Sequence, residues 1–569
     1  MPVFKTVKPQ ETHIGASGRP SLLSAKFQGQ VFSTMISWES ACLLLIALMV
    51  FGLGTKGITN ESVVSLQGDM ARYLMNGVYF YDLLHDMPLA NFIQYTYEYY
   101  AKYPALSLGH HPILLPLAEV PFYTLFGISV YSGRIATLFF FSLSGILWFF
   151  LIRSVSTTTV AALSSLLFVT SPMVVDFSRV VMAEILTLTL LIASSFWFIE
   201  YIERNEKKYG LASIASYILA LYAKQISIFM LPVFVFYAIS RKGIKQFLTK
   251  EMGLGLVGFS IFLLPLLLGT ISFSPTNWDM VFSQSLPTKF EFDNLVFYPD
   301  VLWTRQFSIP EITLGLGALG TVVLLRDKRL RIFLFWIVAL FIILILLGVN
   351  VPRRAIYWVP PFCLLTALSV ELFRDTFWKV LTYGALSCVI LHQSFSGFLA
   401  EPTYAMGYED AAKYIVSHPK GTSVLFSSKV DTGYFTFFVR KWDTERGLVV
   451  LRADKVLSTS LLDKIVEDKI IHRKDMYNIL EDFGTCYIVL EERPYESPAL
   501  NLLWKEVRTE KFVKHQTIKM ASNDSRLQGI SLGIYEYTHC TAPSNDAFLE
   551  MDLPLANRSL KIKFSDVID

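Results

Sequence analysis

Ionisable side chains gather in five separated stretches of this 569-residue chain, each next to an apolar segment. Carboxylates such as Asp69 and Glu184 can accept a proton from an attacking hydroxyl group. Fixed cations can stabilise the negative charge that develops on a departing group. Together these stretches supply the parts of a group-transfer site, and the residues are Asp69, Arg72, Tyr73, His110, His111, Asp176, Arg179, Glu184, Lys224, Arg353 and Arg354.

Long apolar segments separate these stretches and must position them. Hydrophobic residues make up 53% of the chain and charged residues only 17%, whereas a soluble domain has about 25% charged residues. The apolar blocks are long enough to cross a hydrocarbon core of about 30 Å as helices. We therefore predict a polytopic α-helical membrane protein with about eleven transmembrane helices, at 38–55, 130–152, 159–175, 184–202, 209–223, 226–240, 252–272, 309–325, 332–349, 355–371 and 380–396.

The distribution of Lys and Arg predicts the orientation of these helices. The apolar run 112–127 is ambiguous, because it is long enough either to span or to lie on the surface. If it spans, the basic loops near 203–208, 241–250 and 326–331 fall outside, against the positive-inside rule. If it lies along the outer surface, all three loops fall in the cytoplasm. The second arrangement is the better one, and it adds an outer-surface helix to the prediction.

This topology divides the chain into three predicted parts. Residues 1–37 form a cytoplasmic tail, and the first apolar block is expected to be an uncleaved signal anchor because no small-residue cleavage site follows it. Residues 38–399 form the transmembrane catalytic domain. Residues 400–569, which are rich in charge, form an extracytoplasmic soluble domain.

With this orientation, every ionisable stretch lies on the outer side of the membrane. Taken singly, each has an ordinary explanation: Lys224 or Arg353 can snorkel, and Asp69 can be a solvated loop residue. Adjacent histidines rarely bind one metal ion together. An ionisable group at a membrane boundary is nevertheless costly unless it is hydrated, paired or functional. Their joint occurrence on one side predicts an outer cavity with an acid, a base and several cations.

Transfer of a group from a lipid-linked phosphate fits such a cavity. Lys224 and one of the two adjacent arginines, Arg353 or Arg354, would hold the departing phosphate. Asp69 would take the proton of the attacking hydroxyl group. A lipid donor explains why the site lies at the membrane surface. The chain has no Gly-rich nucleotide-binding loop, and its net charge of +3 does not indicate a nucleic-acid partner.

Several short motifs resemble the GT-C-fold glycosyltransferases that use polyprenyl-phosphate sugars. Residues 68–73, Gly-Asp-Met-Ala-Arg-Tyr, resemble the first outer loop of that family, which carries the proposed catalytic base. Residues 110–114 resemble the His-Pro-Pro-Leu stretch that opens a surface helix, and residues 171–184 resemble the second outer loop. Lys224 corresponds to a lysine that binds donor phosphate. Residues 353–360 resemble an Arg-Tyr-x-x-Pro stretch before a late helix.

The resemblance covers roughly residues 38–400 and implies a function. The family includes the protein O-mannosyltransferases, the lipid A aminoarabinose transferase and Rgt-like bacterial transferases of lipopolysaccharide sugars. It implies a hexosyl- or pentosyltransferase that moves a sugar from a polyprenyl-phosphate donor to a hydroxyl of a lipid, glycan or protein acceptor. The expected location is the cytoplasmic (inner) membrane of a bacterium, among membrane lipids.

The resemblance also implies roles for individual residues. The catalytic residues would be Asp69 and Glu184, and Lys224, Arg353 and Arg354 would bind donor phosphate. The resemblance implies no cofactor, and a divalent metal ion is the alternative. The expected substrate contacts are Arg72, Tyr73, His110, His111 and Arg179, and the candidate metal ligands are Asp69, His110, His111 and Glu184.

The chain departs from the family pattern at three positions. Met70 stands where many members have Glu, so a second acid is missing there. Ile113 replaces the second Pro, and Glu184 replaces the Asp of many relatives.

A transporter or flippase of lipid-linked sugars is the alternative function, and a catalytically inactive membrane scaffold is a third. A transporter is expected to have polar or broken helices near the bilayer midplane. The segments 252–272, 332–349 and 355–371 carry no charge in their middles. This distribution favours an enzyme whose site faces the outer surface.

Helical and strand patterns alternate in residues 400–569, and this alternation predicts a small α/β domain. Cys486 and Cys540 can pair in an oxidising compartment or remain unpaired thiols. A charged set, Arg440, Asp443, Arg446 and Arg452, predicts a solvated face, with an acceptor groove as the alternative. Amphipathic helices are predicted at 408–417, 460–471 and 475–483, and strands at 423–426, 448–451, 486–490 and 530–537.

Overall fold

The computed structural model describes residues 29–66, 69–88, 90–244, 250–273, 275, 285–461, 465–470, 472–553 and 558–568. The chain divides into two compact units, residues 1–45 and residues 46–569. The first unit contains the beginning of helix α1 (Gly29–Gly54). The second contains the other helices and all described strands.

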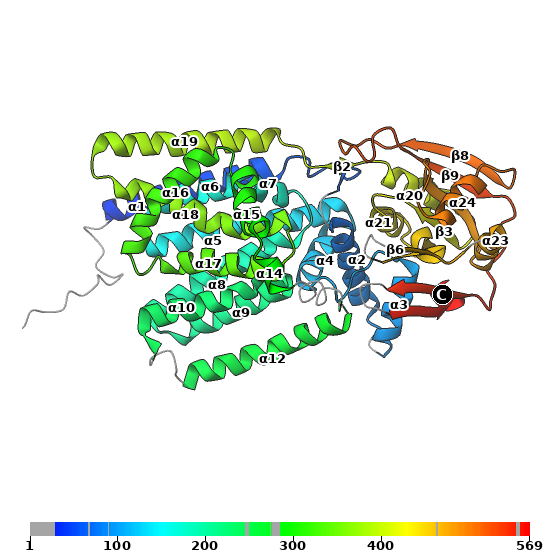
Figure 1. The fold of residues 1–569 in the computed structure, drawn as a ribbon, viewed down its shortest axis with the longest axis horizontal. Coiled ribbons are helices and arrows are strands. Elements are labelled where there is room, and N and C mark those ends of the chain that lie inside the picture. Colours follow the sequence, from blue (N-terminus) through cyan, green and yellow to red (C-terminus); the bar gives the residue numbers. More distant parts are fainter. Residues whose placement is uncertain are drawn as a thin grey trace, which may run out of the picture. The chain divides into compact units, whose positions relative to one another are not determined.

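Each predicted apolar segment corresponds to a helix in the structure (Figure 1). The helix ends agree with local sequence signals: the Ser129 side chain accepts a hydrogen bond from the Ser132 amide where α5 begins, and Asn205 adopts a left-handed conformation where α8 ends. After α1, the helices are α5 (Val130–Val155), α6 (Thr158–Thr170) with α7 (Pro172–Ser178), α8 (Ala183–Arg204), α9 (Lys207–Ala223), η1 (Gln225–Phe229) with α10 (Met230–Lys242), α12 (Lys250–Phe273), α16 (Pro310–Arg326), α17 (Arg331–Leu347), η3 (Pro352–Trp358) with α18 (Val359–Leu372), and α19 (Thr376–Leu399).

Not every one of these helices is long and apolar enough to cross a membrane by itself. Among the described residues, three meet both conditions, at 130–155, 183–204 and 352–372. The number rises to five if two bent pairs each count as one span. One of these pairs is α6 and α7, which bend by 62° where Pro172 interrupts the helix. The total of about eleven spans remains a prediction.

Close packing between α16 and α18 depends on glycine. A Cβ atom at Gly320 would overlap the carbonyl oxygen of Leu365, so only glycine allows this approach. The hydroxyl group of Thr366 donates to the carbonyl oxygen of Thr313 at 2.9 Å across the same contact. Small residues and inter-helix hydrogen bonds of this kind are typical of packed membrane helices.

The predicted surface segment 112–127 forms helix α4 (Leu114–Phe126). It packs against α2 (Met70–Asp86), which begins directly after Asp69. A Cβ atom at Gly77 of α2 would overlap the buried carboxylate of Glu119 of α4, so the two helices approach closely. Further segments outside the predicted spans are α3 (Phe92–Lys102), α14 (Leu286–Lys289), α15 (Phe292–Val301) and η2 (Leu302–Gln306).

The C-terminal region contains a mixed five-stranded sheet in the order β4-β3-β7-β9-β8. Strand β3 runs parallel to β4 and β7, and β9 runs antiparallel to β7 and β8. The predicted α/β architecture is therefore present. The strands are β3 (Ser423–Ser427), β4 (Val449–Arg452), β7 (Thr485–Glu491), β8 (Phe512–Lys519) and β9 (Ser531–Tyr537), and the main helices are α20 (Tyr408–Ser417), α21 (Gly433–Trp442), α23 (Arg473–Asp482) and α24 (Pro498–Glu506).

Smaller elements complete this region. A short strand, β1 (Val64–Ser65), pairs with β2 (Tyr404–Ala405), and the last two strands form a hairpin. The remaining elements are α22 (Ala453–Val456), β10 (Phe548–Leu553), β11 (Arg558–Lys563) and α25 (Phe564–Ile568).

Two predictions for this region are wrong. The predicted helix 460–471 is largely a hairpin of β5 (Ser458–Leu461) and β6 (Ile465–Asp468), while 462–464 and 471 lie outside the described residues. The β-branched residues in both segments favour this strand pairing over an amphipathic helix. The expected solvated charged face is also wrong for Arg440, whose side chain is only 7% exposed because it is paired with Asp82.

Cys486 and Cys540 form a disulfide, with 5.1 Å between their Cα atoms. The sequence left both the paired and the unpaired state open for these residues. The disulfide ties the beginning of β7 to the segment that follows β9.

Candidate functional site

Asp69 lies at the N-terminal end of α2, where its carboxylate meets three other side chains. One oxygen is 3.1 Å from Nη2 of Arg353, and the other is 3.2 Å from Nη1 of Arg72. Nε2 of His111 is 3.7 Å from the second oxygen. Residues from three of the predicted stretches therefore converge on one acid.

Glu184 is the second acid of the site, and its side chain is fully buried. It lies in the first turn of α8, where the helix dipole favours a negative charge. Lys224 forms an ion pair with it, and Nε of Arg353 is 3.7 Å from the same carboxylate oxygen. The other carboxylate oxygen is buried without a hydrogen-bond partner among the described residues.

Arg353 joins the two acids, because it contacts both Asp69 and Glu184. It comes from the short helix η3, which starts at Pro352. Lys224 has an extended backbone conformation and lies between α9 and η1, where the helix is interrupted. The chain breaks its regular helices at these positions, and each break brings a cation to the site. The result is a chain of alternating charge, Asp69–Arg353–Glu184–Lys224.

The surroundings keep Asp69 ionised. Burial by itself would raise the pKa of Asp69, but the neighbouring His111 side chain and the charges of Arg353 and Arg72 lower it well below its ordinary value. Burial also lowers the pKa of His111, although Asp69 opposes that shift, and burial lowers the pKa of His110 to about 3. Both imidazoles are therefore neutral at pH 7.

Two aromatic side chains line the same cluster. The Tyr73 ring lies 4.8 Å from that of His111, and its hydroxyl group is 3.5 Å from Nδ1 of this histidine. Tyr357 is fully buried and lies within electrostatic reach of Glu184 and Arg353. Tyr357 was not among the residues predicted for the site. Its signal was present, because it is the Tyr of a Tyr-x-x-Pro stretch four residues after Arg353.

Two of the predicted arginines use their donors elsewhere. Arg354 donates to the carbonyl oxygen of Val349 at 2.9 Å. Arg179 donates to the carbonyl oxygens of Leu53 at 2.8 Å, Gly397 at 2.8 Å and Ala400 at 3.0 Å. These carbonyls lie at the ends of α1 and α19, so Arg179 caps two helices.

Arg134 is a further residue that sequence reasoning missed. It donates to the carbonyl oxygens of Gly57, Asn60 and Val63 at 2.6–3.0 Å and so organises the loop before Asp69. The signal was an arginine inside an apolar segment, which indicates a buried or functional role.

The candidate metal ligands do not form a metal site in the described part of the chain. No three His, Cys, Asp or Glu side chains there are arranged to hold an ion. Asp69 and His111 are near each other, but Glu184 is occupied by Lys224 and Arg353. A divalent ion would have to displace these cations, so the donor set does not fit one.

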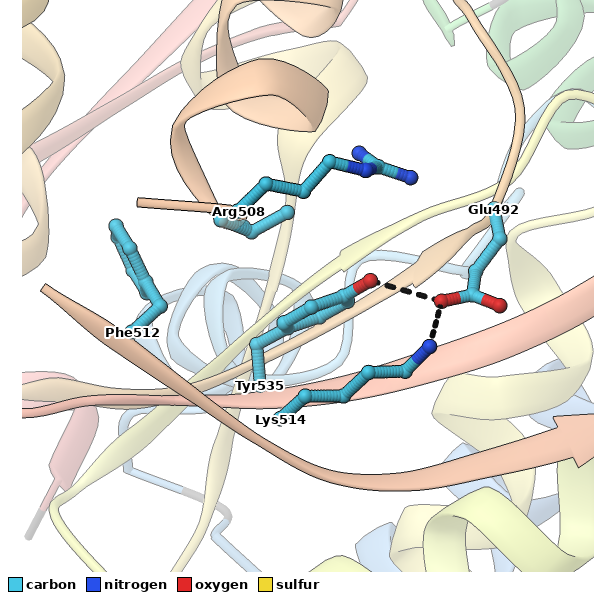
Figure 2. Close-up of a pocket in the computed structure, with 6 residues that line it drawn as sticks. Glu492, Arg508, Phe512, Lys514 and Tyr535 are labelled. Atoms are coloured by element: carbon cyan, nitrogen blue, oxygen red, sulfur yellow. Dashed lines mark hydrogen bonds and ion pairs between the residues drawn. The ribbon is translucent and has the colours of Figure 1, made fainter. Parts of the chain in front are cut away.

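A surface cavity of about 450 Å³ lies in the C-terminal region, away from this cluster (Figure 2). Its polar groups are already paired: Glu492 accepts a hydrogen bond from the Tyr535 hydroxyl at 2.8 Å and forms an ion pair with Lys514. It is also lined by Arg508, Phe512 and Val507. None of the predicted site residues lines it.

Residues 110–268 match the family model described as dolichyl-phosphate-mannose-protein mannosyltransferase. No curated protein sequence matches the chain.

Solved structures with a similar fold include ArnT from Cupriavidus metallidurans. In its undecaprenyl phosphate-bound state ArnT aligns with a TM-score of 0.55 and 12% identity, and in its apo state with 0.57 and 11%. Both alignments cover 90% of this chain and 100% of ArnT. The Archaeoglobus fulgidus oligosaccharyltransferase in complex with Zn and sulfate aligns with a TM-score of 0.53 and 11% identity, covering 79% of this chain and 68% of that one.

These comparisons confirm the resemblance to the GT-C-fold glycosyltransferases that use polyprenyl-phosphate sugars. The chain has the GT-C fold, and it is an integral membrane protein.

Proposed function

We propose that the chain is a membrane glycosyltransferase that moves a sugar from a polyprenyl-phosphate donor to a hydroxyl group of a lipid, glycan or protein acceptor. One observation carries the proposal: an alternating chain of acids and cations, Asp69–Arg353–Glu184–Lys224, that is half-buried except for the fully buried Glu184. The undecaprenyl phosphate bound to ArnT, which has the same fold, supports a donor of this chemistry. The sugar is a hexose or a pentose.

In this mechanism, the cations bind the donor and the acid activates the acceptor. Lys224 and Arg353 would hold the phosphate, with Arg354 nearby as a further cation. The bond between the anomeric carbon and the phosphate oxygen breaks, and the phosphate leaves with the electron pair. The acceptor oxygen forms the new bond to that carbon, and its proton passes to Asp69.

The charge of the phosphate would also adjust the base. In the free protein, cations lower the pKa of Asp69, so the carboxylate is ionised but weakly basic. A phosphate that binds Arg353 adds negative charge beside Asp69 and competes for its partner. Both effects raise the pKa of Asp69, because nearby negative charge disfavours the ionised carboxylate. Donor binding would therefore make Asp69 a better proton acceptor.

Glu184 is proposed to hold Lys224 and Arg353 at a fixed separation and to prevent their mutual repulsion. Arg72 and His111 lie beside the Asp69 carboxylate, and Tyr73 and His110 contact His111. All four side chains are proposed to contact substrate. Arg179 is better explained as a helix cap, because its three hydrogen bonds are to backbone carbonyls.

A direct assay separates this proposal from a transporter of lipid-linked sugars. Purified protein in liposomes is expected to release free undecaprenyl phosphate from undecaprenyl-phosphate hexoses or pentoses when an acceptor is present. Mass spectrometry of a deletion strain should identify the acceptor by the sugar that it lacks. Movement of intact donor across the bilayer, without release of lipid phosphate, would instead support the flippase function.

The site and the C-terminal region are proposed to lie outside the cytoplasm, in the inner membrane of a bacterium. The Cys486–Cys540 disulfide supports this placement, because disulfides persist in oxidising compartments.

Single cysteines are expected to follow this topology. Cysteines introduced at positions 205 and 328 should react only with reagents that enter the cytoplasm, because basic loops stay inside. A cysteine at position 300 should react with an impermeant maleimide added outside. Positions 205, 300 and 328 are all exposed, so reagents on the correct side can reach them. Labelling of position 205 from outside would reverse the topology and place the candidate site on the cytoplasmic side.

A further inference from the structure

The C-terminal region contacts the chain on both sides of Asp69. Before Asp69, strand β1 pairs with β2, so Val64 and Ser65 are held by Ala405 and Tyr404. After Asp69, helix α2 packs against α21. The candidate base therefore lies in a short segment whose two ends are fixed by residues beyond position 400.

The first turn of α2 is held by the beginning of α21. A Cβ atom at Gly433 would lie 2.8 Å from Cβ of Ala71, so glycine permits an unusually close approach. The next residue, Tyr434, donates a hydrogen bond from its hydroxyl group to the carbonyl oxygen of Ser65. Asp431 accepts hydrogen bonds from the amides of these two α21 residues at 2.8 and 3.0 Å, which fixes the helix end.

Farther along α2, a buried ion pair prevents the helix from rotating about its axis. Arg440 of α21 donates to both carboxylate oxygens of Asp82, at 2.8 Å from Nε and 2.5 Å from Nη2. The side chains are 7% and 3% exposed. The Tyr99 hydroxyl group donates to the same carboxylate at 2.6 Å. A two-pronged guanidinium contact fixes direction as well as distance, so it restricts rotation of α2 about its axis.

The neighbouring helix α3 belongs to the same assembly. Ala101 of α3 is fully buried in the hydrophobic core of the C-terminal region, beside residues of its sheet. Arg452 donates to the carbonyl oxygen of Pro104 at 3.0 Å, directly after α3. The core of the C-terminal region is therefore incomplete without residues from the first outer loop.

We propose that Arg440 is a positioning residue for the transfer reaction: through Asp82 and the rigid helix α2, it sets the orientation of Asp69 toward the acceptor. The C-terminal region is then a necessary part of the catalytic unit. The proposal rests on the proposed function for the role of Asp69, while the contact itself is independent of it.

The test compares two variants of Arg440 with a matched control variant, all in the full-length protein. Arg440→Lys keeps the positive charge but loses the two-pronged contact, whereas Arg440→Met leaves Asp82 buried without its partner. The control is Arg493→Met, which removes an arginine of the same region whose carboxylate partner, Glu491, lies within that region. The measurements are turnover, KM for a lipid-phosphate sugar donor, and hydrogen exchange of the amides in 70–86.

Both Arg440 variants are expected to lower kcat by about tenfold or more, because a misplacement of about 1 Å can cost about 100-fold. KM for the donor should change little, since Lys224 and Arg353 are untouched. Amide exchange in α2 should accelerate in these variants and not in Arg493→Met. If Arg440→Met does not fold, Arg440→Lys decides the result.

Two outcomes would overturn the proposal. One is unchanged exchange in α2 of folded Arg440→Lys, which would mean that the ion pair does not restrain the helix. The other is faster exchange with wild-type turnover, or an equal loss of turnover in the control. If the wild-type protein transfers no sugar at all, the proposed function fails. The exchange experiment still tests whether the Arg440–Asp82 ion pair restrains α2.

Discussion

Asp69→Asn is expected to reduce sugar transfer by about 10²- to 10⁴-fold, the contribution typical of general-base catalysis. Asparagine keeps the size of the side chain but cannot accept the proton of the acceptor hydroxyl at neutral pH. Arg72 and Arg353 would lose an ionic partner, yet Arg353 still has Glu184 beside it. The folded protein should therefore still bind undecaprenyl phosphate, as measured by its thermal shift with the lipid.

The control for this prediction is Asp300→Asn, which alters an exposed acid on the predicted outer side. It should leave transfer unchanged. A chelator titration of the parental protein adds a second comparison, because a metal-bound Asp69 would make transfer chelator-sensitive. Transfer by purified Asp69→Asn protein at near the parental rate would remove Asp69 from the mechanism.

Lys224→Met is expected to cause the second large loss, about 10²-fold in kcat/KM. The comparison is with the removal of one oxyanion-stabilising donor, which typically costs about 10²- to 10³-fold. Lys224 is ion-paired with the fully buried Glu184, so its ammonium group is fixed before the donor arrives. The variant should bind undecaprenyl phosphate more weakly, which separates it from Asp69→Asn.

Two further variants show whether this loss comes from a lost phosphate contact or from a disturbed fold. Lys207→Met changes a lysine at the opposite end of α9 and should be nearly silent. A double variant, Lys224→Met with Glu184→Gln, relieves the buried acid that has lost its partner. If the double variant regains folding but still binds donor poorly, then Lys224 acts on the phosphate. Normal donor binding in Lys224→Met would instead indicate a snorkelling lysine.

The sequence predicted the helices well because apolar length is a local property. Each apolar block became a helix, and the run 112–127 contains helix α4, whose position along the outer surface stays a prediction. The joint position of ionisable stretches also predicted a cluster, and Asp69, Glu184, Lys224 and Arg353 do meet. Each of these residues lies next to a helix end, which is why topology alone could bring them together.

The partners of the other arginines could not be read from the sequence. Arg179 and Arg134 donate to backbone carbonyls of distant segments. Because every residue has such a carbonyl group, the sequence does not indicate which one accepts the hydrogen bond. Arg440 has a carboxylate partner, but Asp82 is 358 residues away and only the folded chain brings them together. The β5–β6 hairpin was missed because a helical period was assigned to a short mixed segment, where helix and strand patterns are hard to distinguish.

The hydrogen bonds of Arg179 have a consequence for how the chain is made. Its guanidinium group holds carbonyls that lie 126 residues earlier and 218 and 221 residues later in the sequence. A ribosome delivers the N-terminal part first, so the arginine must be inserted long before two of its three acceptors exist. During that interval water, lipid head groups or the insertion machinery must solvate the charge. The bundle is then closed by its last helix, α19, and an interrupted chain that stops before Gly397 would leave a buried cation uncovered for quality-control proteases to recognise.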